Sequence, residues 1–186
     1  RIAEARVHGF QGSALNDPLS MAACAKHFAG YGFSEAGRDY NTVDVSDYTL
    51  YNVIYPPFQA AKKAGVATFM NSFNTLNGIP ATGNQALASV LKEDWGFEGV
   101  LVSDWGSIGE MQAHGYAENI KQATQQAATA RCDMDMESLA YVQYLAALVR
   151  EGEVSESIVD DAVRRVLKLK FDLGLMDDPY RYCNRP

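Results

Sequence analysis

The stretch that decides the fold is Gly99-Val-Leu-Val-Ser-Asp104-Trp105-Gly106. An unbroken apolar run leads into a carboxylate, an indole and a glycine. Continuous apolar runs of this length are typical of strands that are buried on both faces of a parallel sheet. Asp104 would then lie at the carboxyl end of its strand, which is the edge where α/β enzymes gather their catalytic groups.

Three further segments repeat this pattern on either side of it. They cover Met21–Phe28, Val66–Phe73 and Ala128–Met136. Each is nearly continuous in apolar residues and has polar residues at its end. The spacing of about 30–45 residues is the size of a βα unit.

Helical patterns fill the gaps between these segments. We expect helices over Ser46–Tyr55, Phe58–Ala64, Asn84–Trp95, Glu118–Thr129, Ser138–Glu151 and Ser155–Leu173, with a break at Pro56-Pro57. No hairpin is expected. Strand and helix therefore alternate, which predicts an α/β fold with a parallel sheet. No G-x-G-x-x-G motif follows any strand, so a dinucleotide-binding fold has no support.

Two architectures fit this order of elements. One is a doubly wound open sheet, and the other is part of a (β/α)8 barrel, which usually needs about 250 residues. Polar residues at the ends of all four expected strands favour the barrel. Because the chain begins with Arg1, inside a helical pattern, we expect it to be a piece of a longer protein.

Composition excludes several classes of protein. The 186 residues include 16 Lys and Arg against 23 Asp and Glu, and 47% are apolar. These are globular proportions, and the net charge of −7 argues against a nucleic-acid partner. No apolar run is long enough for a membrane span. Three widely spaced cysteines favour neither a disulfide framework nor a zinc site.

Asp104 and Trp105 are the strongest candidates for chemistry. The carboxylate could act as a nucleophile or base, and the indole offers a flat apolar face that suits the C–H face of a sugar ring. The structural alternative, in which Asp104 caps the next helix and Trp105 packs in the core, is equally compatible with the pattern.

Lys26 and His27 end the first expected strand. They could hold ligand hydroxyls, a phosphate or a carboxylate, and Lys26 could form a Schiff base. A surface lysine beside a core histidine is the alternative. Since successive strand residues point to opposite faces, both reach one pocket only if the backbone bends.

Other polar residues follow the strands. Arg38, in the glycine-rich loop 30–41, could clamp hydroxyls through its planar fork or simply be solvated. Met70 could line a pocket or pack in the core. Asp133 and Asp135 resemble a metal or sugar-hydroxyl site, but no histidine or further oxygen ligand is near in sequence, so no metal is expected.

Taken together, six motifs resemble glycoside hydrolase family 3, and in particular its bacterial periplasmic β-glucosidase group. The motifs are Ala25-Lys-His-Phe28, Gly37-Arg-Asp-Tyr-Asn41, Tyr55-Pro-Pro-Phe58, Leu76-Asn-Gly-Ile-Pro-Ala-Thr82, Val102-Ser-Asp-Trp-Gly106 and Phe171-Asp-Leu-Gly-Leu175. The resemblance implies the C-terminal half of a (β/α)8 barrel, with four parallel strands, over residues 1–176. Residues 177–186 would begin a linker to a second domain of the same parent chain.

The resemblance also implies an activity. Family members hydrolyse terminal β-linked sugars with retention, through a covalent glycosyl-enzyme, and need no cofactor. By resemblance Asp104 is the nucleophile, Lys26 and His27 bind hydroxyls of the sugar, and Arg38, Met70 and Trp105 line its site. Phe73 stands where related β-glucosidases commonly have a tyrosine.

The resemblance leaves the second catalytic group open. By resemblance to the β-glucosidase group, the acid/base carboxyl lies on the later domain, and we assign that role to no residue here. The expected substrate is a β-linked oligosaccharide or glycoside, and the expected location is periplasmic or secreted. A β-xylosidase-type enzyme, a non-catalytic sugar-binding module and, remotely, a Schiff-base lyase using Lys26 are the alternatives.

Overall fold

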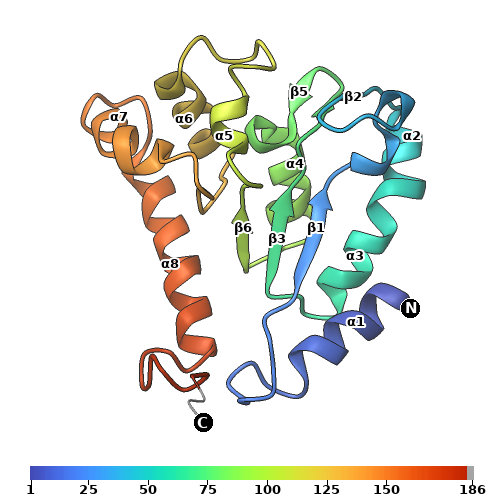
Figure 1. The fold of residues 1–186 in the computed structure, drawn as a ribbon, viewed down its shortest axis with the longest axis vertical. Helices are drawn as coiled ribbons and strands as arrows, with labels where there is room; N and C mark the ends of the chain where they lie inside the picture. Colours follow the sequence, from blue (N-terminus) through green and yellow to red (C-terminus); the bar gives the residue numbers. More distant parts are fainter. Residues whose placement is uncertain (184–186) are drawn as a thin grey trace.

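A three-stranded parallel sheet forms the centre of the molecule (Figure 1). The computed structural model describes residues 1–183. The strands are β1 (Cys24–Phe28), β3 (Thr68–Asn71) and β6 (Val100–Val102), in the order β1-β3-β6. Thr68 pairs with Cys24 on one side and with Val100 on the other. Three of the four expected strands and the α/β class are thereby confirmed, with each strand shorter than its apolar run.

The helices connect and flank these strands. Strands β1 and β3 are joined through α3, and β3 and β6 through α4 (Figure 1). The α-helices are α1 (Ile2–Gln11), α2 (Asp47–Thr49), α3 (Tyr55–Lys63), α4 (Gln85–Ser89), α5 (Ser107–Glu110), α6 (Ile120–Thr129), α7 (Ala146–Arg150) and α8 (Glu156–Asp172). Wider π-helical turns lie at Leu50–Ile54 (η3), Val90–Asp94 (η5) and Tyr141–Leu145 (η6). Short 3-10 turns cover Tyr31–Phe33 (η1), Glu35–Gly37 (η2) and Ala81–Gly83 (η4).

The fourth expected strand, Ala128–Met136, was wrong in its extent. Helix α6 continues to Thr129, so the first part of the apolar run is helical. Beyond it, the chain runs beside β6 and makes a single parallel bridge between Met134 and Val102. Backbone hydrogen bonds from Asp133 to Leu101 and from Ser103 to Met134 accompany this bridge. Alanines 127, 128 and 130 suit a packed helix end as well as a strand, which is why the apolar run misled.

A small second sheet also departs from expectation. It contains β2 (Thr42–Val43), β4 (Thr75–Leu76) and β5 (Ile79–Pro80). Strands β4 and β5 form an antiparallel hairpin, which the sequence analysis did not expect. Asn77 and Gly78 occupy its turn with φ of 50° and 84°, the left-handed conformation that Asn-Gly adopts in two-residue hairpins.

The expected helix break at Pro56-Pro57 does not occur. These prolines lie in the first turn of α3, and the residues before them, Leu50–Ile54, form the π-helical turn η3 in place of a regular α-helical turn. The polypeptide therefore stays helical from Asp47 to Lys63.

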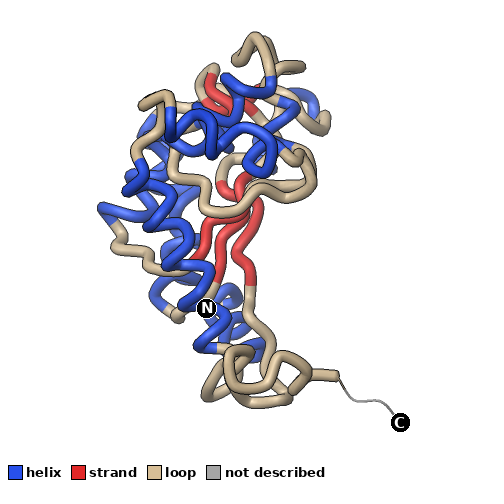
Figure 2. Tube along the Cα trace, turned by 90° about the vertical axis from the view of Figure 1, so that its left-hand side faces the viewer, coloured by secondary structure: helices blue, strands red, loops and turns tan. Residues whose placement is uncertain are grey.

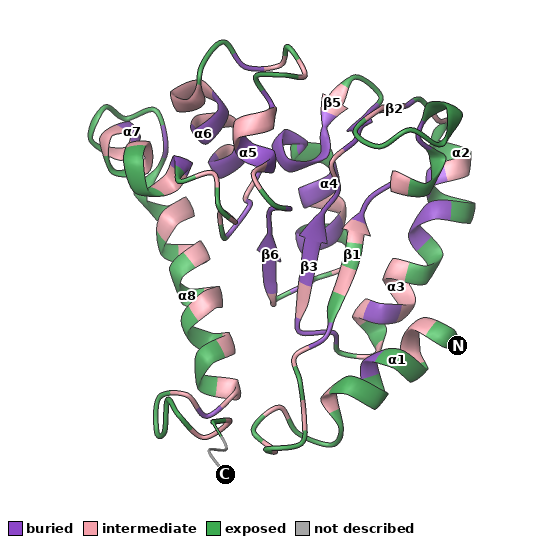
Figure 3. Cartoon of the chain, in the orientation of Figure 1, coloured by how far each residue is buried: buried purple, intermediate pink, exposed green. Residues whose placement is uncertain are grey.

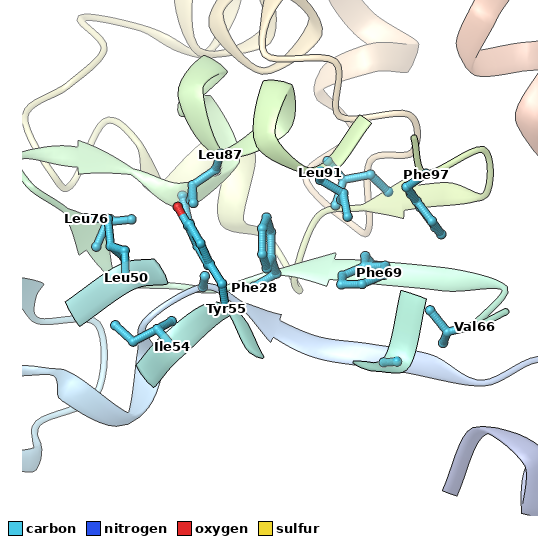
Figure 4. Close-up of a cluster of buried hydrophobic side chains, with 14 of the residues drawn as sticks. Phe28, Leu50, Ile54, Tyr55, Val66, Phe69, Leu76, Leu87, Leu91 and Phe97 are labelled. Atoms are coloured by element: carbon cyan, nitrogen blue, oxygen red, sulfur yellow. The ribbon is translucent and has the colours of Figure 1, made fainter. Parts of the chain in front are cut away.

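The main core lies between the sheet and the helices that cover one of its sides. Figure 2 shows the helices gathered mainly on one side of the three strands. Phe28 is fully buried there beside Tyr55 and Phe69 (Figure 4), and its ring also contacts those of Phe58 and Trp95. Strands β3 and β6 are almost entirely buried, whereas β1 alternates between exposed and half-buried positions before it ends at the buried Phe28 (Figure 3).

A buried ion pair fixes the segment beside β6. Nζ of Lys92 lies 2.5 Å from Oδ1 of Asp133 and also donates to the carbonyl of Arg131 at 2.7 Å. The other oxygen of Asp133 accepts the Leu101 N–H at 2.8 Å. Burial lowers the pKa of Lys92 and raises that of Asp133, and each charge partly offsets the penalty of the other. The pair thus joins η5 and β6 to the stretch around Met134 that runs beside β6.

Two features of the chain remain. No helix within residues 1–183 combines the length and the apolar character that crossing a membrane requires. After α8, residues 177–183 form turns, and the Tyr182 hydroxyl lies 2.9 Å from the carbonyls of Leu15 and Leu173. Residues 184–186 of the expected linker lie outside the described residues.

Candidate active site

An irregularity in β1 brings Lys26 and His27 toward the same side of the sheet. Ala25 pairs with Phe69 and Phe28 pairs with Asn71, so three steps along β1 match two along β3. This extra residue is a bulge, and a bulge re-aims the side chains on its strand. Nζ of Lys26 lies 3.9 Å from Sδ of Met70, and Nε2 of His27 lies 3.4 Å from Oδ2 of Asp104. The backbone of β1 therefore has the bend that Lys26 and His27 need to face the same pocket.

Asp104 lies two residues beyond the end of β6 and is 7% exposed. Its Oδ1 accepts a hydrogen bond from the backbone N–H of Trp105 at 2.7 Å. Oδ2 is buried and has no hydrogen-bond donor within the described residues, although the His27 ring is near it. The carboxylate is therefore held by one oxygen and uncommitted at the other, as a nucleophile requires.

His27 is partly buried beside this carboxylate. Burial lowers the pKa of His27, and the negative charge of Asp104 opposes the shift. The adjacent Lys26 cation lowers the pKa further. The imidazole is therefore mostly neutral at pH 7 and keeps one nitrogen as a donor and one as an acceptor.

The other predicted site residues differ in how far their side chains are buried. Met70 is buried on β3 and Lys26 is exposed, which does not suit a Schiff-base lysine because such amines are desolvated. Trp105, which follows Asp104, is 62% exposed, so its side chain does not pack in the core. Arg38 is exposed in the loop before β2, and its guanidinium forms no ion pair with any residue that the structure describes.

Aromatic side chains form a wall that begins at His27. The Tyr31 ring meets the His27 ring edge-on at 5.3 Å between centroids and the Phe73 ring at 6.1 Å. Tyr40 lies 4.5 Å from Phe73, and a ring nitrogen of His114 lies 3.1 Å from the Phe73 carbonyl. The wall therefore runs from β1, past the end of β3, to the segment after α5.

Sequence reasoning missed one carboxylate, Glu110, which ends α5. It is half-buried, and its Oε2 is buried with no hydrogen-bond partner in residues 1–183. Burial raises its pKa, and the charges of Asp104 and Asp39 add to the shift. The signal that could have found it is an acid six residues after Asp104 in an otherwise apolar turn, Ile108-Gly-Glu-Met111.

The Asp133 and Asp135 pair does not form a ligand site. Asp133 is committed to Lys92 and to the Leu101 N–H. Asp135 accepts backbone N–H groups of Ser138, Ala140 and Tyr141 at 2.7–3.3 Å and so caps the following turn. Within residues 1–183, no group of three or more His, Cys, Asp or Glu side chains is arranged to hold a metal ion.

The fold and this arrangement of an aspartate, a histidine, a lysine and a tryptophan can be compared with known proteins. Residues 1–169 match the family model of the glycosyl hydrolase family 3 N terminal domain. The chain belongs to this family.

Relatives support the same assignment. The chain is 42% identical over 182 residues to a periplasmic β-glucosidase of Salmonella typhimurium, covering 97% of this chain and 24% of the relative. It is 32% identical over 189 residues to a β-xylosidase of Formosa agariphila, covering 95% and 26%. The structure of a Listeria innocua β-glucosidase in complex with glucose superposes with a TM-score of 0.94 at 47% identity, over 97% of this chain and 26% of that one. The chain thus spans about a quarter of the length of these relatives.

Proposed function

We propose that this chain is the nucleophile-bearing part of a retaining exo-β-glycosidase of the β-glucosidase type. The observation that carries the proposal is the Asp104 carboxylate, which is buried, oriented through Oδ1 by the Trp105 N–H, and free of donors at Oδ2. Such a group can attack an anomeric carbon, whereas both oxygens of Asp135 are occupied by backbone N–H groups.

In the proposed reaction, Oδ2 of Asp104 forms a bond to the anomeric carbon while the bond to the leaving oxygen breaks. The leaving oxygen takes a proton from a general acid, and a glycosyl ester remains on Asp104. Water, deprotonated by the same group, then attacks the anomeric carbon and releases the sugar with retained configuration.

The neighbouring residues take binding roles in this proposal. Lys26 and His27 donate hydrogen bonds to sugar hydroxyls from the β1 side, and His27 also faces the attacking oxygen. Met70 forms an apolar wall, and the exposed Trp105 ring stacks on the C–H face of the sugar. Arg38, exposed in the loop before β2, is proposed as a further donor to sugar hydroxyls.

A retaining glycosidase needs a second carboxyl group about 5–5.5 Å from the nucleophile. We assign that acid/base role to no residue of this chain. Because the relatives are about four times as long, we propose that residues 1–176 form the last four βα units of a (β/α)8 barrel. Residues 177–186 would then lead toward a second domain that supplies the acid/base.

A β-xylosidase is the second candidate, because relatives carrying that name match over nearly the whole chain. A periplasmic or secreted location follows only from the name of one relative. In either case the substrate is a β-linked oligosaccharide or glycoside, and no cofactor takes part.

The test compares hydrolysis of 4-nitrophenyl β-glucoside and β-xyloside by the full-length protein and its Asp104→Asn variant. We expect release of nitrophenol, faster from the preferred sugar, and a loss of kcat of roughly 10⁴-fold in the variant. Asp160→Asn, on the exposed face of α8, is the matched control and should keep full activity. Binding of glucose without turnover would instead indicate a sugar-binding module, and near-full activity of Asp104→Asn would remove Asp104 from the mechanism.

A further inference from the structure

A continuous path of contacts leads from the nucleophile around the site and back to its own strand end. His27 contacts Asp104 at 3.4 Å, the Tyr31 ring meets His27, and Phe73 meets Tyr31. The His114 ring then binds the Phe73 carbonyl.

The path closes through α5. The backbone N–H of His114 donates to the carbonyl of Glu110 at 3.1 Å. Glu110 donates its own N–H to Gly106, which lies two residues after Asp104. Glu110 therefore belongs to the frame of the site, and its carboxyl lies near enough to Asp104 and Asp39 for their charges to act on it.

Two carboxylates in this frame each keep a buried oxygen without a donor. They are Oδ2 of Asp104 and Oε2 of Glu110. A buried carboxylate oxygen without a hydrogen bond is costly, and side chains with no partner in their own chain are typical of sites that bind polar ligands. Asp104 has its use in the proposed reaction, whereas Glu110 has none there.

We propose that Glu110 is a further substrate-binding residue, whose carboxylate accepts a hydrogen bond from a hydroxyl group of the sugar bound beside Asp104. The inference rests on the proposed glycosidase function. Lys26 and His27 offer donors beside Asp104, and Glu110 offers an acceptor in the same frame. Sugar hydroxyls both donate and accept, so donors and an acceptor together fix the orientation of the ring.

The hydroxyl could belong to the sugar that becomes attached to Asp104 or to the sugar of the leaving group. The experiment separates these two sources by comparing 4-nitrophenyl β-glucoside, whose leaving group carries no sugar hydroxyl, with the disaccharide laminaribiose. Full-length protein is used with Glu110→Met, which removes the acceptor, and Glu110→Gln, which keeps a weaker, neutral one. The same two substitutions at Glu98, exposed before the start of β6, are the matched controls.

We expect KM to rise about tenfold or more in Glu110→Met, with a smaller rise in Glu110→Gln, because a hydrogen bond to a charged group is lost or weakened. A rise with both substrates places the hydroxyl on the attached sugar, and a rise with laminaribiose alone places it on the leaving group. Circular dichroism and thermal unfolding matched to wild type show that the fold is intact.

Three results would contradict either the binding role of Glu110 or the glycosidase function on which it rests. An unchanged KM with both substrates in folded Glu110→Met would overturn the inference while the glycosidase assignment stands. A fall in kcat that azide restores, with formation of a glucosyl azide, would make Glu110 the acid/base instead of a binding residue. Wild-type protein that hydrolyses neither substrate would remove the proposed function itself.

Discussion

Nε2 of His27 lies 3.4 Å from Oδ2 of Asp104, the one oxygen of that carboxylate that no backbone group holds. The two residues come from β1 and from the end of β6, with β3 between these strands. The bulge in β1 makes the approach possible, because it turns His27 toward Asp104. The pair is the electrostatic centre of the proposed site.

The first prediction concerns the protonation of His27. Its pKa is lowered mainly by burial, and the charge of Asp104 limits that shift, so Asp104→Asn should lower the pKa further. A depressed histidine pKa means that the unfolded chain binds the proton more readily. His27 therefore lowers the free energy of unfolding as the pH falls through about 6.5, the pKa of a histidine in the unfolded chain.

NMR titration of the imidazole resonances measures this directly. We expect a His27 midpoint below about 6.5 that falls again in Asp104→Asn. The resonance of His8, exposed on α1, is the internal reference and should not respond to the substitution. A His27 midpoint that stays fixed in the variant would show that the two groups do not interact.

Part of this architecture could be predicted from sequence because it depends on local patterns. Continuous apolar runs identified β1, β3 and β6, and the motif around Asp104 located the nucleophile candidate at a strand end. The Ala128–Met136 run failed because alanine packs equally well in a helix, and tertiary contacts decided for α6.

Other features depend on pairing between distant segments. The partner of Asp133 is Lys92, 41 residues away, and no local pattern indicates it. Glu110 gains its importance only from the burial of Oε2 and the nearby carboxylates. The Asn77-Gly78 dipeptide is a strong turn signal, so the turn of the hairpin could be predicted. Its strands are only two residues long, too short to give an alternating pattern in the sequence.

The second prediction tests the buried ion pair. Lys92→Met leaves the Asp133 carboxylate buried without its counter-charge, so we expect a loss of about 3–5 kcal/mol in the free energy of unfolding. Adding Asp133→Asn removes the orphaned charge, keeps an acceptor for the Leu101 N–H, and should recover part of that loss.

Urea unfolding followed by tryptophan fluorescence provides the measurement. The matched control is Lys121→Met, because Lys121 pairs with Glu151 at 2.6 Å on the surface and such pairs contribute about 0–1 kcal/mol. Equal losses in the two variants would contradict the structural role given to Lys92.

The third prediction separates binding from stability. Trp105→Ala removes an aromatic face that is 62% exposed, so we expect KM for an aryl glucoside to rise roughly 2- to 10-fold. The free energy of unfolding should change by less than about 0.5 kcal/mol. Phe28→Ala, in the aromatic core, should instead cost about 3–5 kcal/mol of stability.

Steady-state kinetics and thermal unfolding of both variants check this contrast. A Trp105→Ala protein that loses stability as Phe28→Ala does, or that keeps the wild-type KM, would show that the indole does not serve as a sugar platform.

The central claim is that Asp104 forms a covalent bond to the sugar. Incubation of the full-length protein with a 2-deoxy-2-fluoro-glucoside that bears an activated leaving group tests it most directly. The activated group needs little acid assistance, and the fluorine slows hydrolysis of the glycosyl ester, so the adduct accumulates. Peptide mass spectrometry should find fluoroglucose on the peptide that contains Asp104, and none on the same peptide of folded Asp104→Asn. An adduct on a different residue, or its persistence in Asp104→Asn, would contradict the account.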